Sequence, residues 1–390
     1  MTSPTPAHII GLGAVSAYGW GRQALWNGLI SGKSAAALLP GFGRTLDDPG
    51  WVASIADLGD PADGVTPFAR AMRSAAREAI EDALERGWNP GARVGLIVAS
   101  VLGDLDMYSM VTPGASGFSS RQYVAVTPST PVSTLMTDYG FHGPAMTVSA
   151  MCTSGSAAVI TAKTWLDSDM VDDVVVVAVD LSARREVVSM FVQLGVAITD
   201  TDPLSACRPF QEDSSGFIFG EAAIAMTLSR GTRVDRYGSV LGGALSHDGY
   251  HATSVDPSLT HVRGCVEQAL STARVTGDDI RYLNAHGPGT RQCDAAEGAI
   301  ASEMLPNADV FSVKPLAGHC QAAAGMVELA ATLLGYEHSE IPATPQTSTP
   351  RVSRLLDGRT PMESGLTLKT SLGMGGHNAA LVVGGRESVD

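Results

Sequence analysis

The stretch TVSAMCTSGSAA, residues 147–158, decides how the rest of the chain is interpreted. It predicts an apolar strand that ends at Cys152 and turns at once into a helix of small residues, from about Thr153 to Leu166. The first turn of such a helix directs unpaired backbone N–H groups and the positive end of the helix dipole toward the sulfur, and both favour a thiolate. We therefore interpret Cys152 as a nucleophile. The alternative is a buried structural thiol, which is common for a free cysteine.

The overall composition is that of a soluble globular enzyme. The 390 residues are 44% hydrophobic and 17% charged, which provides for a large core and two lobes of similar size. The net charge of −14 argues against general binding to nucleic acid or anionic lipid, because both require a basic surface. We see no signal-peptide pattern and no apolar run of about 20 residues, so we expect a cytoplasmic protein without a membrane span. None of the five cysteines forms a Cys-x-x-Cys pair, which predicts neither a disulfide framework nor a zinc site.

Apolar stretches that predict strands alternate with helical stretches. Strands are expected at residues 8–15, 94–99, 173–180 and 224–228, and helices at residues 22–31, 68–86 and 153–166. This alternation indicates an α/β fold. Residues 103–130 are rich in glycine and serine, and we expect them to form a loop region that lines a pocket. The charged turn at 230–236 marks a boundary between two lobes, residues 1–235 and 236–390.

The stretch FSVKPLAGHCQAAAG, residues 311–325, repeats the pattern around Cys152: a short strand, a tight turn and a helix of small residues. Two such helices can pack backbone to backbone, which would bring Cys152 and His319 together. A second histidine, His286, lies in the glycine turn at 284–290 after another apolar strand. A lone histidine is more often a polar core residue. Two histidines and a cysteine in equivalent turns indicate an active site for nucleophilic catalysis.

Gly11 and Gly13 begin like a dinucleotide-binding fingerprint, but we reject that interpretation. The third glycine of the fingerprint is replaced by Ser16, and no helix follows directly.

From GLGAVS at residues 11–16 to GMGGHN at residues 373–378, four separated motifs stand in the order found in the β-ketoacyl synthases, which this sequence resembles nearly end to end. These are the decarboxylating condensing enzymes of fatty-acid and polyketide assembly. The resemblance implies an α/β, thiolase-like fold with two pseudo-twofold-related lobes in α-β-α-β-α layers. The N-terminal lobe, 1–235, would carry the nucleophilic cysteine, and the C-terminal lobe, 236–390, the two histidines.

The resemblance also implies roles for individual residues. Cys152 would accept the acyl group, while His286 and His319 would decarboxylate the extender and stabilise the enolate. Lys314 and Glu328 resemble the buried charged pair that holds the hydrogen-bond network of the histidines. The backbone N–H groups of Cys152 and Met374 would hold the oxyanion. Asp294 and Glu297 resemble acidic residues that brace loops.

Further residues are implied to bind the substrate: Met374, Gly375, Thr290, His251 and Thr253. His247 and His251 have the spacing of metal ligands on a helix, but they lie in a segment that resembles a family loop near the substrate entrance, so we expect no metal. No cofactor is required, because the substrates are carried on the phosphopantetheine of an acyl carrier protein.

Two kinds of partner are implied. Arg70, Arg73 and Arg77 share one face of the helix at 68–86. A solvated face is the usual explanation, and the alternative is a docking surface for the acidic carrier protein. The family also implies a homodimer, or a heterodimer with a related synthase, paired through the strand after the cysteine helix, residues 174–179.

The sequence departs from the family pattern close to the reaction centre. Met374 replaces a common phenylalanine, and the other departures are Pro288, Cys320, His377, Gln211 and Ser214. They leave two alternatives open. One is acyl transfer to an amine, an alcohol or water without decarboxylation. The other is a chain-length-factor-like partner subunit, although such partners typically lack the nucleophile. The acyl chain, the extender unit and the pathway are not specified by the sequence.

Overall fold

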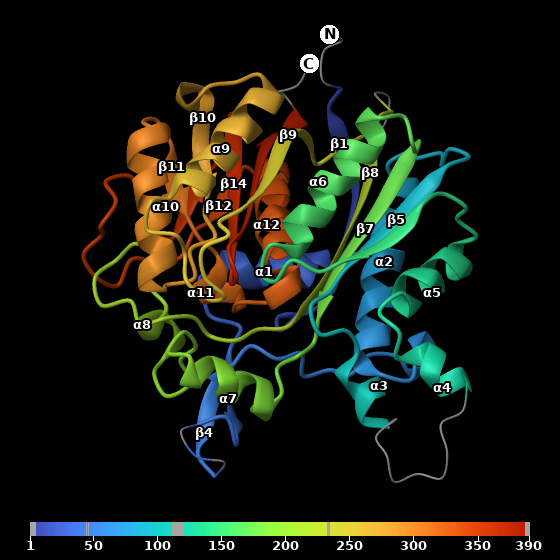
Figure 1. Ribbon diagram of the computed structural model, residues 1–390, viewed down its shortest axis with the longest axis horizontal. Helices are drawn as coiled ribbons and strands as arrows, with labels where there is room; N and C mark the ends of the chain where they lie inside the picture. The colour runs from blue at the N-terminus through green and yellow to red at the C-terminus, as the bar shows by residue number, and fades with distance from the viewer. Residues whose placement is uncertain (1–4, 44, 46, 111–119, 232–234, 387–390) are drawn as a thin grey trace.

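The computed structural model describes residues 5–43, 45, 47–110, 120–231 and 235–386 (Figure 1). Strands from both halves of the chain are joined in one bent sheet, in the order β11-β10-β14-β15-β9-β1-β8-β7-β5-β6, with the short β2 (Gly19–Trp20) beside β1. The first half contributes β1 (Ala7–Ser16), β5 (Val94–Ala99), β6 (Ala145–Val148), β7 (Asp173–Asp180) and β8 (Ala222–Ser229). The second half contributes β9 (Gly238–His247), β10 (Ile280–Asn284), β11 (Asp309–Phe311), β14 (Leu366–Gly373) and β15 (His377–Gly384).

The two halves of the sheet have the same topology. In each half the outer strands pair in parallel, β6 with β5 and β5 with β7, or β11 with β10 and β10 with β14. The inner strands pair antiparallel, β7 with β8 and β8 with β1, or β14 with β15 and β15 with β9. Only the ends of β1 and β9 pair across the join. We propose on this basis that the chain consists of two duplicated lobes, residues 1–235 and 236–390.

Helices complete the layers that the sequence predicted. The helices α6 (Ser154–Asp167) and α12 (Ala324–His338) lie between the two halves of the sheet, and each contacts strands of both (Figure 1). The outer face of the first half is covered by α2 (Pro67–Glu85) and α5 (Thr130–Tyr139). The outer face of the second half is covered by α9 (Thr260–Ala273) and α10 (Arg291–Met304). The predicted α-β-α-β-α architecture is therefore confirmed.

Small residues allow α6 and α12 to approach closely. A Cβ atom added at Gly325 would lie 2.3 Å from the Ser156 hydroxyl oxygen, and one added at Gly155 would lie 3.0 Å from the Ala322 carbonyl oxygen. Only a hydrogen atom fits at these positions without displacing the neighbour. The predicted backbone-to-backbone packing is thus confirmed, and it sets the starts of the two helices beside each other.

Shorter elements connect the layers. The region 103–130 is not only loop, because it contains α3 (Leu105–Met110) and α4 (Ser120–Ala125), while residues 111–119 lie outside the described residues. The remaining helices are α1 (Arg22–Ile30), α7 (Arg185–Gln193), α8 (Pro203–Ala206) and α11 (Lys314–Ala317), with short 3₁₀ turns at Pro61–Asp63, Gly277–Asp279 and Gln321–Ala323. Two small hairpin sheets pair β3 (Ala37–Pro40) with β4 (Pro49–Val52) and β12 (Glu340–Pro342) with β13 (Arg359–Pro361).

One prediction about the assembly is wrong. The strand at 174–179 belongs to β7, and β7 pairs with β5 on one edge and with β8 on the other. Neither edge is free to pair with another subunit. The free edge at this end of the sheet belongs to β6, where Ala145 and Met146 are exposed.

Within the described residues, no helix has both the length and the apolar surface that crossing a membrane would require.

Candidate active site

Cys152 lies in the tight turn between β6 and α6. Met151, just before it, has a φ of 49°, a left-handed conformation that is unusual for a residue with a side chain. The Ser154 hydroxyl fixes this turn by donating to the Met151 carbonyl and accepting from the Ala150 N–H at 2.8 Å. Cys152 is 7% exposed, so the residue is buried.

The Cys152 thiol is protonated at neutral pH. Burial raises its pKa to about 11, and the carboxyl of Asp180 acts in the same direction. The Lys314 ammonium and the backbone N–H groups of Met374 and Cys152 lower the pKa, but less strongly. Burial therefore opposes the thiolate that the start of α6 is expected to favour. The same two N–H groups, however, are the ones predicted to form the oxyanion hole.

His286 follows β10 in a loop that two carboxylates hold in place. Glu297 of α10 accepts the backbone N–H of His286 at 2.7 Å and that of Gly287 at 2.8 Å. Asp294 accepts the Gly289 N–H and the Phe210 N–H, both at 3.1 Å. Burial raises the pKa of Asp294 to about 7. These contacts confirm that both acidic residues brace loops.

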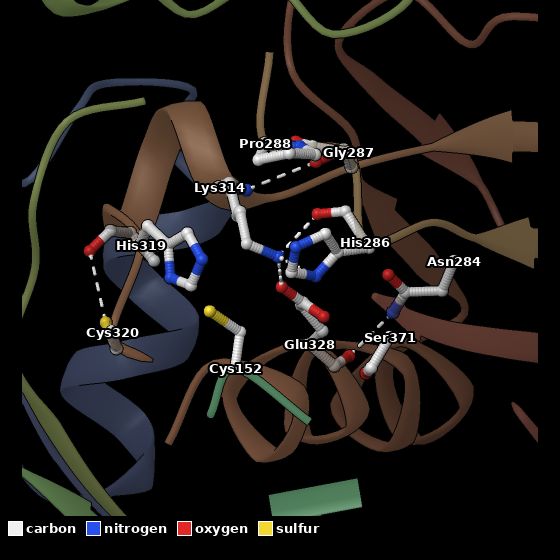
Figure 2. A network of polar contacts seen from close by, with 12 residues as sticks. Cys152, Asn284, His286, Gly287, Pro288, Lys314, His319, Cys320, Glu328 and Ser371 are labelled. Carbon is white, nitrogen blue, oxygen red and sulfur yellow. Dashed lines mark hydrogen bonds and ion pairs between the residues drawn. The ribbon is translucent and has the colours of Figure 1, made fainter. Parts of the chain in front are cut away.

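His319 follows α11 and faces His286. The ring centroids are 5.4 Å apart and the ring planes are inclined by 83°. In Figure 2 the sulfur of Cys152 points toward the two imidazole rings. Both histidines are 2% exposed. The three residues predicted to act together are therefore brought into one buried site from three distant parts of the chain.

The hydrogen bonds fix the tautomer of each imidazole. The Gln321 backbone N–H donates to His319 Nδ1 at 3.1 Å, and Lys314 Nζ lies 3.0 Å from His286 Nδ1. Because both Nδ1 atoms accept, each neutral ring carries its proton on Nε2. Burial and the Lys314 charge hold the pKa of both histidines well below the usual value. The site thus contains two neutral imidazoles, each with an Nε2–H donor.

Lys314 and Glu328 form the predicted buried ion pair, and each side chain is 1% exposed. Lys314 also donates to the His286 backbone carbonyl (Figure 2). A second lysine completes this network, because Lys369 Nζ lies 2.6 Å from the other carboxylate oxygen of Glu328. Lys369 is not among the residues predicted from the sequence. A lysine within the apolar strand LTLKTSLG was the available signal.

The glycine turn between β14 and β15 positions the Met374 N–H. Gly375 and Gly376 have φ values of 91° and 90°, which favour glycine. A Cβ atom at Gly375 would lie 3.6 Å from the Ala252 carbonyl oxygen, so the turn lies beside the loop at 247–253. The turn that carries Met374 and Gly375 therefore lies next to the loop that carries His251.

The loop at 247–253 is not helical. His251 Nδ1 accepts the N–H groups of Thr253 and Ser254, both at 3.1 Å, and His247 Nδ1 accepts the Gly249 N–H. No group of three or more histidine, cysteine or acidic side chains that could hold a metal ion is present in the described parts of the chain. Thr290, the other predicted substrate contact, precedes α10, and its hydroxyl lies against the Cys293 thiol.

The arginines on α2 all have partners within the chain. Arg73 contacts Asp138 at 2.7 Å, and Arg77 contacts Asp63 at 2.6 Å. Arg70 donates to three backbone carbonyls. Docking of a carrier protein at this face stays a prediction. An acidic carrier would have to replace the present partners of these arginines or bind alongside them.

The departures from the family pattern lie around the site. His377 stacks edge-on against His247, with ring centroids 4.7 Å apart. The buried Cys320 thiol faces the carbonyls of Ala317 and Gly318. Gln211 accepts two backbone N–H groups, and Ser214 donates to the Gly289 carbonyl at 2.9 Å. Gln211, Ser214 and Gly289 also line a surface cavity of about 1030 Å³, which neither Cys152 nor the two histidines line.

A buried cysteine beside two neutral imidazoles, in a fold of five alternating helix and sheet layers, is the arrangement of a condensing enzyme of the thiolase type. The chain belongs to the β-ketoacyl synthase family. Residues 5–233 match the family described as "Beta-ketoacyl synthase, N-terminal domain", and residues 237–348 match "Beta-ketoacyl synthase, C-terminal domain". It is an enzyme of the acyltransferase class.

Individual relatives agree with this assignment. The chain is 31% identical over 369 residues to the tetracenomycin polyketide synthase ketoacyl synthase alpha subunit of Streptomyces glaucescens, covering 86% of each protein. It is 27% identical over 416 residues to 3-oxoacyl-[acyl-carrier-protein] synthase 2 of Rhizobium meliloti, covering 96% of this chain and 97% of the relative. A type II polyketide ketosynthase, solved in complex with its acyl-carrier protein, has the same fold with a TM-score of 0.86 and 21% identity, covering 98% of this chain and all of that chain.

Proposed function

We propose that this chain catalyses decarboxylative Claisen condensation between an acyl group on Cys152 and a malonyl-type thioester on an acyl carrier protein, in fatty-acid or polyketide-type biosynthesis. The observation that carries the proposal is the pair of neutral imidazoles, His286 and His319, whose Nδ1 atoms are both occupied as acceptors. Two Nε2–H donors directed at one thioester oxygen stabilise an enolate.

The first half-reaction loads the enzyme. The Cys152 sulfur attacks the carbonyl of an acyl thioester, and the oxyanion that forms is held by the N–H groups of Cys152 and Met374. The carrier thiol leaves and takes up the proton that Cys152 loses. Because burial keeps Cys152 protonated at rest, this proton transfer is part of the loading step.

The second half-reaction forms the carbon–carbon bond. The malonyl-type thioester loses carbon dioxide, and the electron pair of the broken bond is delocalised onto the thioester oxygen, where His286 and His319 donate hydrogen bonds. The resulting carbanion attacks the acyl carbon on Cys152. The cysteine thiolate then leaves and takes a proton from water, which restores the enzyme.

The remaining residues of the site are assigned to binding. Met374, Gly375, Thr290, His251 and Thr253 would contact the acyl chain and the phosphopantetheine arm. The closeness of Gly375 to the loop at 247–253 supports this placement. No other cofactor is needed for the two half-reactions.

The proposed partners are an acyl carrier protein and a second synthase subunit, either a copy of this chain or a related one. The structural neighbour that is in complex with its acyl-carrier protein supports the first. The exposed edge of β6 supports the second, and the face of α2 with Arg70, Arg73 and Arg77 stays our candidate for carrier docking. We also propose a cytoplasmic location, because the proposed substrates are carried by an acyl carrier protein.

The test combines product analysis with intact-protein mass spectrometry. Purified protein supplied with acyl and malonyl carrier proteins is expected to release carbon dioxide and form a 3-oxoacyl carrier, with the acyl mass on Cys152. Cys152→Ala should abolish the acyl adduct and the product. Cys207→Ala removes another buried thiol as a matched control and should retain both. Product formation by Cys152→Ala would contradict the proposal.

The same experiment separates the alternative function. Pro288, Cys320 and His377 lie at positions where the family carries other residues, and they motivate acyl transfer to an amine, an alcohol or water. An acyl adduct on Cys152 with a transferred product and no carbon dioxide would select this alternative. A catalytically inactive chain that copurifies with an active synthase would instead identify a partner subunit.

A further inference from the structure

We infer that Lys369 is a positioning residue of this site, which holds Glu328 and Lys314 in place so that His286 keeps its proton on Nε2. The inference deepens the proposed function and rests on it. Lys369 acts through other side chains, and it does not itself reach the reacting atoms.

The contacts form a continuous chain from Lys369 to His286. Lys369 Nζ contacts Glu328 Oε2 at 2.6 Å, Glu328 Oε1 pairs with Lys314 Nζ, and Lys314 Nζ lies 3.0 Å from His286 Nδ1. Lys369, Lys314 and Glu328 are each 1% exposed or less. Each link is therefore shielded from water. In such a buried environment charged contacts are strong, and the loss of one partner is costly.

The strand β14 gives Lys369 a second connection, to the cysteine helix. Lys369 and Ser371 are two residues apart and share one face of the strand, where Lys369 Nζ lies 3.2 Å from Ser371 Oγ. Ser371 Oγ lies 2.8 Å from Ser156 Oγ of α6, four residues after Cys152. Thr370, on the opposite face, donates to Glu297 at 2.5 Å, and Glu297 holds the His286 backbone. One strand segment thus links the nucleophile's helix to both supports of His286.

The charges show why one lysine is insufficient. Glu328 has two oxygens, and Lys314 occupies only one of them. Without Lys369 the second oxygen would lose the cation that lies against it, and Lys314 would be drawn from His286 toward that oxygen. The Lys369 charge also opposes protonation of His286. The charged or titratable groups around this imidazole are Lys314, Lys369, Glu297, Glu328, His319 and Cys152.

The test uses Lys369→Met, which keeps an unbranched side chain, one atom shorter, and removes its charge. In protein with ¹³C- and ¹⁵N-labelled histidine, assigned with His286→Gln, we expect wild-type His286 to be the Nε2–H tautomer. In Lys369→Met we expect a mixture of tautomers and a pKa higher by about half a unit or more. Condensation should lose about 10- to 100-fold in kcat with little change in KM, because the imidazole is misplaced. The acidic limb of the pH profile should move to higher pH.

Lys163→Met is the matched control. Lys163 is another buried lysine, on α6, paired with Asp167 at 2.9 Å and far in sequence from the histidines. It should change neither the His286 tautomer nor the pH profile, and Lys369→Arg should restore part of the activity. Wild-type behaviour of Lys369→Met, or an equal change in Lys163→Met, would overturn the inference.

Two further outcomes need separate treatment: a Lys369→Met variant that does not fold, and a wild-type protein that forms no product. If Lys369→Met does not fold, Lys369→Gln removes the charge while keeping a donor for Ser371, and the same readouts apply. If the wild-type protein forms no 3-oxoacyl product, the proposed function fails. The tautomer measurement requires no turnover and tests Lys369 separately.

Discussion

At the residue scale, the three side chains expected to react, Cys152, His286 and His319, are uncharged in the resting site. Cys152 rests as a thiol and the two histidines rest neutral, because burial disfavours every ion that a neighbour does not stabilise. The side chains of Lys314, Lys369 and Glu328 beside the histidines are paired with one another. In the proposed mechanism, charge that develops during the reaction meets prearranged N–H donors.

The raised pKa of Cys152 predicts an unusual pH dependence of alkylation. Reaction with iodoacetamide requires the thiolate, and the thiolate fraction increases about tenfold per pH unit below the pKa. We expect the rate of alkylation at Cys152 to increase steadily up to about pH 10. Peptide mass spectrometry measures this rate, and the Cys152→Ala variant identifies the modified peptide. A plateau below pH 9 would show that the thiol is not desolvated as the structure indicates.

Glu297 provides a stability prediction. Its carboxylate accepts the N–H groups of His286 and Gly287 and the Thr370 hydroxyl. Glu297→Gln replaces one acceptor with a donor and leaves a buried N–H unpaired, so we expect a loss of about 2 kcal/mol. Thermal unfolding should show a midpoint lower than that of Glu85→Gln, a matched change at the exposed end of α2. Equal midpoints for the two variants would contradict this role.

At the element scale, the packing of α6 against α12 sets the distance between the two halves of the site. Cys152 precedes α6, and His319 lies shortly before α12. Because no side chain separates the helices at Gly155 and Gly325, a change there would move one functional group relative to the other.

Two glycine substitutions in helices should therefore have opposite effects. Gly325→Ala places a Cβ atom 2.3 Å from the Ser156 hydroxyl and should destabilise the protein by about 1–3 kcal/mol through overpacking. Gly264→Ala on the exposed face of α9 meets no atom within 4 Å and should stabilise it by about 0.5–1 kcal/mol through helix propensity. Denaturant unfolding of both variants measures the difference. A stabilised Gly325→Ala would disprove the close contact.

At the scale of the whole molecule, Cys152, His286 and His319 meet between two halves of the sheet that share one topology. Each half of the sheet is followed by a tight turn that carries a site residue and by a helix of small residues, and the two helices share the middle layer. The two halves join through β1 and β9 in the middle of the sheet, and β6 is the edge strand of the first half. An edge strand with exposed apolar side chains is a template for pairing with another chain.

This edge predicts the mode of assembly. Light scattering coupled to size exclusion should give about twice the chain mass of 40.4 kDa. Met146 on β6 is 39% exposed, and Met146→Glu should shift the protein toward the monomer. Met170→Glu introduces the same charge at another exposed methionine and should leave the mass unchanged. A wild-type monomer would exclude the homodimer, and a dimer of Met146→Glu would exclude this edge.

Much of the fold and the site could be predicted because local patterns carry them. The β-branched run of β7 and the small residues of α6 and α12 specify elements whose type depends on neighbouring residues. The motifs around Cys152, His286 and His319 specify the chemistry in the same local way. Short helices within 103–130 were missed because a stretch rich in glycine and serine gives no helical periodicity.

The sequence by itself was enough to predict the α/β class, a site that brings together Cys152, His286 and His319, and the Lys314–Glu328 pair. Only the tertiary structure decided that Cys152 rests as a thiol, that Lys369 completes the charged network and that β6 rather than β7 is the free edge. The physical reason is that the desolvation of a side chain and the pairing of a strand edge both depend on neighbours that are distant in the sequence. A linear pattern records what each residue is able to do, whereas the packed neighbours decide its charge, its tautomer and its partners.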